Sequence, residues 1–178
     1  MLTQSLTLIV VAALLAGAGY DVVTRRIPNN LVLAGLVAAF AAAGAAGGNA
    51  ALGLAVVAAA IAFVIGFGAF AVGAFGGGDA KFLMVGAAFV GLPQMASYLM
   101  AVALLGGLLA IMAVVRRRAG IEATVMTVDL AKNMLTLGRK GYRGRLGDDG
   151  RMAVPYGVAI AGAALVVQFT SFSEWLFR

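Results

Sequence analysis

Residues 27–78 read IPNNLVLAGLVAAFAAAGAAGGNAALGLAVVAAAIAFVIGFGAFAVGAFGGG and contain no charged side chain. As a single α-helix these 52 residues would be about 78 Å long, because a helix rises 1.5 Å per residue. The hydrocarbon core of a bilayer is only about 30 Å thick. The stretch therefore predicts two apolar helices that fold back on each other, with Gly47-Gly48-Asn49 as the turn.

Three further uncharged stretches, residues 1–20, 82–115 and 152–173, surround this one. The whole chain has the same bias: 63% of its 178 residues are hydrophobic, 11% are charged, and the mean hydropathy is +1.03. A chain of this length cannot hide so much apolar surface inside a water-soluble fold. The sequence predicts an all-α polytopic membrane protein. It excludes a soluble enzyme, a nucleic-acid-binding protein and a disordered chain as descriptions of the whole.

The stretch 82–115 allows one tilted helix or two shorter ones, and the distribution of positive charge favours two. Pro93-Gln94 divides it into a short arm, Phe82–Leu92, and a longer arm, Met95–Val115. With two arms, twelve of the thirteen Lys and Arg residues lie on one side of the membrane. Positive charge gathers on the cytoplasmic side. We therefore predict about six transmembrane helices, a short fourth one, and an N-terminus outside.

In this topology residues 116–151 form a cytoplasmic segment within a single membrane-embedded domain that comprises residues 1–178. Met126, Leu130, Met134 and Leu137 recur at helical spacing within the segment. A basic amphipathic helix that lies in the headgroup plane is the expected structure.

Two small cytoplasmic clusters each place one aspartate, Asp21 or Asp79, at the end of an apolar stretch. The chain contains no His and no Cys, so imidazole and thiolate chemistry and the usual metal sites are excluded. Two carboxyl groups held close together share a proton, because both cannot ionise easily. The ionised one can then accept a proton from water, and the protonated one can stabilise charge on a peptide carbonyl. This chemistry requires neither a metal nor a cofactor.

Each aspartate alone also has an ordinary structural interpretation. Asp79 can cap a helix that begins at Ala80, and Asp21 can pair with Arg25 four residues later. The catalytic hypothesis depends on both aspartates occurring at similar depth on one side of the membrane.

The two clusters resemble the motifs of the GxGD intramembrane aspartyl proteases, and specifically those of the bacterial prepilin peptidases. In that family one catalytic Asp precedes a basic segment of the Ile-Pro-Asn type, as Asp21 precedes residues 24–29 here. The second catalytic Asp closes Gly-x-Gly-Asp and has a Lys two residues later, as in residues 76–79 and Lys81. Residues 154–157, Val-Pro-Tyr-Gly, look like a Pro-x-Gly element of the same enzymes.

The resemblance implies that Asp21 and Asp79 are catalytic. The residues it implicates as supporting the site are Gly76, Gly78, Lys81, Arg25, Pro28 and Asn29. No cofactor and no metal are implied.

The subtype follows from what the chain lacks. The long, bifunctional members carry a cysteine-bearing cytoplasmic segment and methylate the new pilin N-terminus, whereas this chain has no cysteine. It looks like the short, peptidase-only form associated with Flp-type pili. The implied substrate is a prepilin or pseudopilin, cut at the cytoplasmic face of the bacterial inner membrane. The lipid bilayer is the other expected partner and nucleic acid is not one. No oligomeric state is implied.

A small transporter subunit that moves protons or cations through the same two aspartates is the main alternative. Transporter sites lie near the bilayer midplane, usually between two similar halves of the chain. Here both aspartates lie at the predicted cytoplasmic boundary and no internal repeat is visible, so the sequence favours the peptidase.

Overall fold

The computed structural model describes residues 1–117 and 155–170, and every regular element in them is helical. These elements are α1 (Leu2–Thr24), α2 (Asn29–Ala71), α3 (Gly77–Val90), the short 3₁₀ helix η1 (Leu92–Gln94), α4 (Met95–Arg117) and α6 (Tyr156–Thr170). The predicted all-α class is therefore confirmed for the described part of the chain. The predicted amphipathic helix lies outside the described residues, as does the segment from residue 118 to residue 151.

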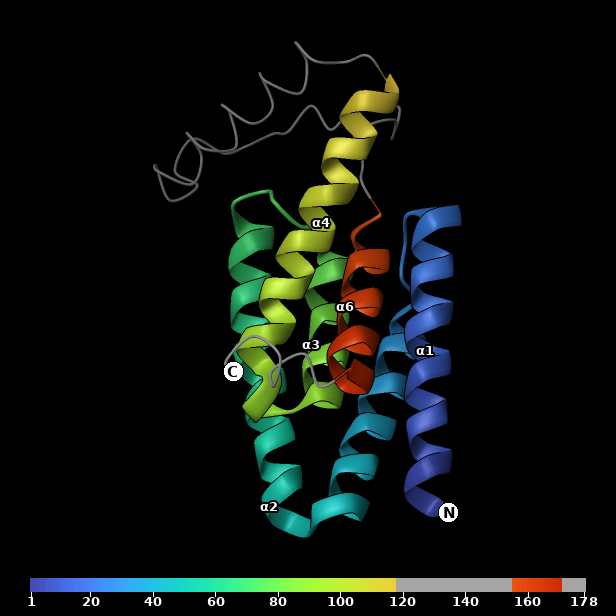
Figure 1. The fold of residues 1–178 in the computed structure, drawn as a ribbon, viewed down its shortest axis with the longest axis vertical. Coiled ribbons are helices and arrows are strands. Elements are labelled where there is room, and N and C mark those ends of the chain that lie inside the picture. The colour runs from blue at the N-terminus through green and yellow to red at the C-terminus, as the bar shows by residue number, and fades with distance from the viewer. Residues whose placement is uncertain (118–154, 171–178) are drawn as a thin grey trace.

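The predicted turn in the long apolar stretch is confirmed. α2 reverses its direction at Gly47 and Gly48, whose backbone angles are not helical. Gly48 has a φ of 64° and a ψ of −156°, a conformation that only glycine adopts without strain. Two antiparallel arms result, residues 29–46 and residues 49–71, and Figure 1 shows them meeting at one end of the molecule.

The predicted division of the stretch 82–115 is also confirmed. α3 has only 14 residues and ends at Val90, and its C-cap Gly91 adopts a φ of 79°. η1 contains Pro93 in its first turn, and α4 begins at Met95. Proline has no N–H to donate and glycine tolerates the positive φ, so the chain turns here and α4 runs back beside the bundle (Figure 1).

The helices are those of a membrane protein. Among residues 1–117 and 155–170, three are long and apolar enough to cross a bilayer: α1, α2, and the stretch Leu92–Ala113 that includes most of α4. α2 counts once here, although it contains two antiparallel arms, and α3 and α6 are shorter. The six-span topology therefore remains a prediction. Large apolar side chains such as Leu15, Phe67 and Leu104 point outward, as lipid contact requires.

α3 lies at the centre of the bundle and contacts its neighbours through small residues. It packs most extensively on α2, and it also contacts α1, α4 and α6. The ring of Phe82 fills the space beside Gly17 of α1, and Val85 lies where a side chain on Gly35 of α2 would have to go. Because lipid supplies no hydrophobic driving force between helices, such close packing is what holds them together.

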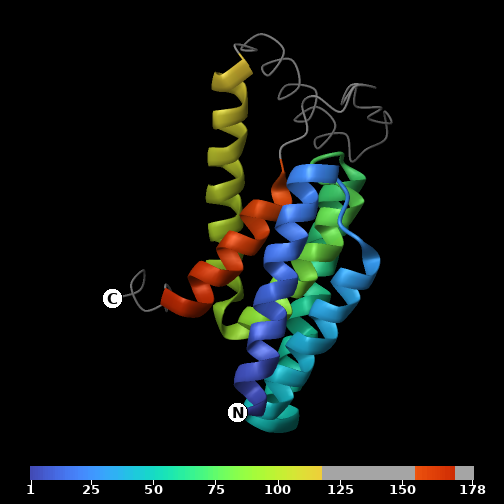
Figure 2. The same ribbon diagram turned by 90° about the vertical axis from the view of Figure 1, so that its right-hand side faces the viewer.

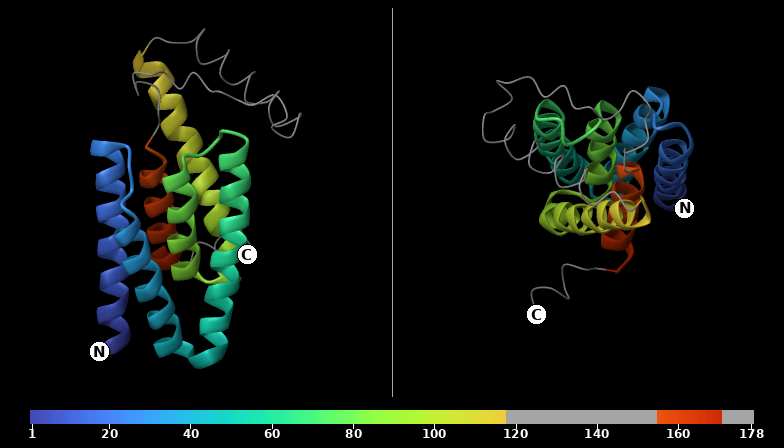
Figure 3. Two further views of the ribbon diagram at one scale, coloured as in Figure 1. Left: turned by 180° about the vertical axis from the view of Figure 1, so that it is seen from behind. Right: turned by 90° about the horizontal axis from the view of Figure 1, so that it is seen from above.

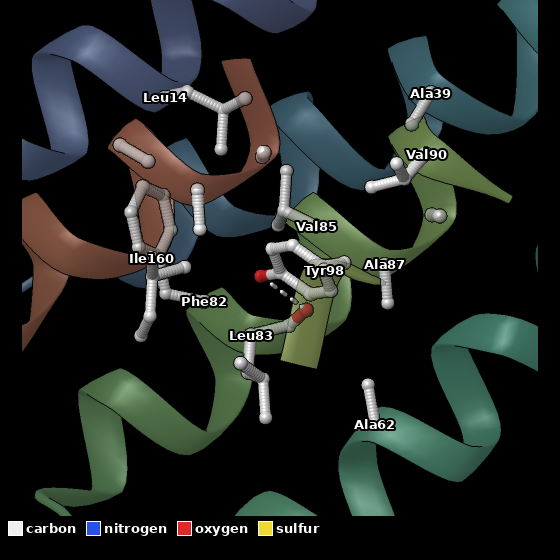
Figure 4. Packing of buried hydrophobic residues seen from close by; sticks show 14 of the residues in the cluster. Leu14, Ala39, Ala62, Phe82, Leu83, Val85, Ala87, Val90, Tyr98 and Ile160 are labelled. Atoms are coloured by element: carbon white, nitrogen blue, oxygen red, sulfur yellow. Dashed lines mark hydrogen bonds between the residues drawn. The ribbon is translucent and has the colours of Figure 1, made fainter. Parts of the chain in front are cut away.

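The same packing continues toward α4. Tyr98 of α4 is completely buried, and its hydroxyl donates a 3.3 Å hydrogen bond to the carbonyl oxygen of Leu83. Figure 4 shows this bond among the buried side chains that surround α3. A side chain on Gly86 would collide with the Tyr98 ring, so this glycine is required for the contact.

Three helix ends that carry polar residues lie at the same end of the bundle. α1 ends there, and α3 and α6 begin there, as Figures 1 and 2 both show. The N-terminus and the turn of α2 lie at the opposite end, which the view from behind in Figure 3 makes clear. This arrangement brings residues 21–29, residues 76–81 and the start of α6 together.

Candidate active site

Asp21 lies in the last turn of α1 and is buried, with 6% of its surface exposed. Its Oδ2 atom accepts a 2.8 Å hydrogen bond from the backbone N–H of Gly157, at the start of α6. A Cβ on Gly157 would lie 2.9 Å from Cβ and 3.0 Å from Oδ2 of Asp21. Only a glycine at this position lets the backbone of α6 approach the carboxylate so closely.

The chain turns sharply after Asp21 because α1 ends in a left-handed residue. Arg25 has a φ of 55°, and its N–H donates to the carbonyl oxygen of Asp21 at 3.1 Å. The Thr24 hydroxyl donates to the carbonyl oxygen of Tyr20 at 2.8 Å. Pro28 then precedes α2 as its N-cap, in an extended conformation. The bond between Arg25 and Asp21 is therefore the backbone bond that ends α1 and not the predicted pairing of their side chains, because the Asp21 carboxylate bonds to α6.

Asp79 occupies the first turn of α3, and here one prediction from the sequence was wrong. We expected, as the structural interpretation, a helix that begins at Ala80 with Asp79 as its cap. α3 instead begins at Gly77, with Gly76 as its N-cap and Asp79 as its third residue. The Oδ2 atom of Asp79 accepts a 3.1 Å hydrogen bond from the N–H of Gly76. The helix therefore begins three residues earlier than predicted and includes Gly77 and Gly78, although flexible glycines usually disfavour a helix.

The two aspartates line one cavity of about 300 Å³. Its lining residues are Asp21, Arg25, Arg26, Ile27, Asn29, Gly76, Gly77, Gly78, Asp79 and Lys81. Seven of the eight residues singled out in the sequence are among them, and the eighth, Pro28, is the N-cap of α2, next to Asn29 in the chain. The other five acidic residues of the chain lie outside the described residues.

The surroundings of Asp79 favour its protonated form. Burial, and next the negative charge of Asp21, raise the pKa of the Asp79 carboxyl from 3.8 to about 6. The Gly76 N–H and the Arg25 guanidinium oppose this rise without cancelling it. Asp79 precedes the apolar part of α3, at the polar end of the bundle. Near pH 6 the pair can therefore carry one proton and one negative charge.

Lys81 connects two of the segments that line the cavity. Its Nζ atom donates a 3.1 Å hydrogen bond to Oδ1 of Asn29, which lies 52 residues earlier and begins α2. Gly78 lies against Ile27 of the same segment, at ordinary van der Waals distance. The sequence grouped these residues by motif, and the structure places them in contact.

Sequence reasoning did not assign a role to the start of α6. The element Pro155-Tyr156-Gly157 was noticed, but nothing in the sequence placed Gly157 on Asp21, 136 residues away. Tyr156 was missed as well: its ring lies 5.1 Å from that of Phe75, and its hydroxyl is within electrostatic range of Asp79. Within residues 1–117 and 155–170, no cluster of three or more His, Cys, Asp or Glu side chains is suited to a metal ion.

The fold and the site define a helical membrane protein with two carboxyl groups in a cavity at one end of its bundle. The family of this class to which the chain belongs is the type IV leader peptidase family, whose model matches residues 8–111. The members of this family are proteases of the aspartic type, and the matched range includes both Asp21 and Asp79. Neither a curated protein nor a solved structure gave a significant match.

Proposed function

We propose that this protein is a membrane aspartyl endopeptidase that removes the short leader peptide of type IV or Flp-type prepilins or pseudopilins. It acts in the bacterial inner membrane, which the chain crosses about six times with its N-terminus outside. The polar end of the bundle faces the cytoplasm, so the cut falls at that face. Asp21 and Asp79 are the catalytic residues of the reaction.

One observation carries the proposal: two carboxyl groups 58 residues apart in sequence line a single cavity. Burying one acid at a membrane boundary is costly, and placing a second, partly buried acid in the same cavity costs more because their charges repel. A chain that otherwise keeps acids out of its described helices keeps these two. Perturbed acids in a cavity are typical of catalytic sites.

The pair supports hydrolysis without a covalent intermediate. The ionised carboxylate takes a proton from water while the water oxygen bonds to the carbonyl carbon of the scissile peptide. The protonated carboxyl donates a hydrogen bond to the carbonyl oxygen, on which negative charge develops. The C–N bond then breaks, and the leaving amine takes up a proton from the pair. Two peptide ends and a restored pair remain.

The glycines beside Asp79 favour an extended substrate strand. Residues 76–78 have no side chains and line the cavity next to the carboxyl group. A substrate in an extended conformation can therefore bring its backbone close to Asp79. A substrate that stayed helical up to the cleavage site could not do so. A prepilin, with a polar leader followed by an apolar helix, presents its cleavage site at this depth.

Arg25, Arg26 and Lys81 keep the polar end of the bundle on the cytoplasmic side, as the positive-inside rule requires. Lys81 has the additional structural role of holding Asn29. These residues support the site and do not take part in the proton transfers.

A cleavage assay in membranes tests the proposal. A candidate prepilin is co-expressed with the wild type, Asp21→Asn, Asp79→Asn or the control Asn49→Ala, and its loss of mass is followed on a gel. Asparagine preserves the size of the side chain but cannot hold the shared charge. Asn49 is exposed in the turn of α2, at the opposite end of the bundle.

We expect the wild type and Asn49→Ala to remove the leader, and both aspartate variants, present at normal abundance, to leave it intact. Cleavage by either aspartate variant would contradict the dyad. If no prepilin is cut even by the wild type, the peptidase proposal fails, and proton or cation flux through reconstituted vesicles becomes the next activity to measure.

A further inference from the structure

The start of α6 is the one part of the site that lies outside residues 8–111, the range matched by the family model. Pro155 precedes the helix, and its carbonyl oxygen accepts a 3.1 Å hydrogen bond from Val158, which closes the first turn. The N–H of Gly157 is left without a partner inside the helix, as the first amides of any helix are. It points at Asp21 instead.

We propose that Gly157 is a positioning residue that holds Asp21 in its charged form, so that Asp21 accepts the proton from water and Asp79 is the acid. The inference rests on the proposed peptidase function and adds to it a role for each carboxyl group. It also gives α6 a task in catalysis beyond its contribution to the bundle.

The two carboxyl groups differ in the hydrogen bond that each one accepts. The bond from Gly157 to Asp21 is 2.8 Å long, buried, and joins helices at distant points of the chain. The bond from Gly76 to Asp79 is 3.1 Å long, exposed, and lies within one helical turn. A hydrogen bond to a charged group is stronger when it is short and shielded from water. Asp79 lies in the first turn of α3, where the helix dipole favours a negative charge, whereas Asp21 lies near the start of α6 but also in the last turn of α1, where the dipole disfavours it. Burial also raises the pKa of Asp21, and the bond from Gly157 is the main interaction that opposes this rise.

The close contact around Gly157 fixes the orientation of Asp21 as well as its charge. A Cβ at position 157 would lie 2.9–3.2 Å from three atoms of the Asp21 side chain, Cβ, Oδ2 and Cγ. These distances are too short for a carbon atom, so either α6 or the carboxylate must move. The other charged or titratable groups around the pair in the described residues are Arg25 and Arg26 from the turn after α1, Lys81 from α3 and Tyr156 from α6. All four side chains keep their chemical identity in Gly157→Ala.

The pH dependence of cleavage distinguishes the two assignments. The reaction requires the base ionised and the acid protonated, which gives a bell-shaped profile. If Asp21 is the base, weakening its bond to Gly157 makes its charged form less stable and moves the acidic limb to higher pH. The alkaline limb does not move. It reports loss of the proton from Asp79, and Asp21 is ionised both before and after that loss. If Asp79 is the base, the acidic limb stays and the alkaline limb moves.

The experiment compares purified wild type, Gly157→Ala and the matched control Gly162→Ala across pH 4–9, roughly the range in which shifted carboxyl groups titrate. Gly162 lies on the same helix, and an added Cβ would only touch Leu105 at 3.5 Å. We expect Gly157→Ala to lower kcat roughly 100-fold at low pH, with a smaller loss at high pH and little change in KM. Gly162→Ala should keep the wild-type profile.

Pro155→Ala is the second variant, since Gly157→Ala places atoms against a buried side chain and can impair folding. It frees the backbone before α6 without adding atoms near Asp21, and we expect a shift of the acidic limb in the same direction and of smaller size. A uniform loss of kcat at every pH in both variants, or a shift of the alkaline limb, would overturn the inference about Gly157. The peptidase proposal would still stand in that case, as long as the wild type cleaves the prepilin. If the wild type itself cuts nothing, both proposals fall.

Discussion

The Nζ atom of Lys81 lies 3.1 Å from Oδ1 of Asn29, so the N-terminal part of α3 is tied to the first residue of α2. The two residues come from separate motifs, 52 positions apart, and both line the cavity that contains the two aspartates. Lys81 therefore does more than add positive charge, because it fixes the segment after Asp21 relative to Asp79.

This contact predicts a specific kinetic coupling. We expect Lys81→Met and Asn29→Ala each to lower kcat/KM about 5- to 10-fold, as the loss of one exposed hydrogen bond, with a typical net contribution of about 1 kcal/mol, implies. The double variant should be no slower than the slower single variant, because both changes remove the same bond. Initial rates of prepilin cleavage for the four proteins measure this coupling, and losses that multiply would show that the two residues act separately.

The packing of α1 on α3 predicts different outcomes for two glycines of one helix. In Gly17→Ala the new Cβ would collide with the buried ring of Phe82, whereas in Gly19→Ala it meets nothing within 4 Å. We expect Gly17→Ala to destabilise the protein by about 2 kcal/mol, a usual cost of overpacking. Thermal unfolding in one detergent compares the variants, and equal midpoints for both would contradict the packing described here.

The raised pKa of Asp79, about 6, predicts a pH-dependent stability. The folded protein holds this proton more tightly than the unfolded chain, whose carboxyl has the ordinary pKa of 3.8. The raised pKa therefore contributes its full stabilisation of the folded protein below about pH 4, and this contribution is lost as the pH rises through about 6. Residue 79 cannot titrate in Asp79→Asn. The free energy of unfolding of this variant, relative to that of the wild type, should therefore increase by about 1–2 kcal/mol between pH 4 and pH 7.

Unfolding midpoints of the wild type and Asp79→Asn at several pH values measure this difference directly. All other titrating groups are common to the two proteins and largely cancel. A difference that stays constant with pH, or that shrinks as the pH rises, would show that the Asp79 carboxyl does not lie partly buried in one cavity with a second charge.

The chain contains no cysteine, so paired cysteines can test whether residues 21 and 79 face the same cavity. We expect a short bifunctional thiol reagent to link Asp21→Cys to Asp79→Cys within one molecule, with the linked peptides identified by mass spectrometry. The matched pair Asp21→Cys and Asn49→Cys, at opposite ends of the bundle, should remain unlinked. Linkage of both pairs or of neither would contradict the arrangement.

Much of this fold could be predicted because charge and glycine mark its boundaries. The uncharged length of residues 27–78 required a turn, and Gly48 supplies the backbone conformation for it. Gly91 and Pro93 divide the next stretch, as the spacing of positive charge indicated. Asp21 and Asp79 were identified because acids are rare at the ends of apolar helices, and the structure places them in one cavity.

The rest depends on tertiary contacts that leave little trace in sequence. The bond between Gly157 and Asp21 requires the packing of α6 on α1, and the spacing of 136 residues gives no hint of it. The start of α3 at Gly77 was missed because three glycines suggest a loop. In the fold, the Gly77 backbone packs on the ring of Phe70, 3.5 Å from where its Cβ would be, and the helix extends to this point.

The mass of the product that the purified protein makes from a full-length prepilin, in a lipid bilayer, tests the central claim most directly. The account predicts one cut, at the junction between leader and apolar helix, by the wild type and by Asn49→Ala. It predicts no product from Asp21→Asn or Asp79→Asn under the same conditions. The same product from either aspartate variant at close to the wild-type rate would contradict the claim that Asp21 and Asp79 act together as one catalytic pair.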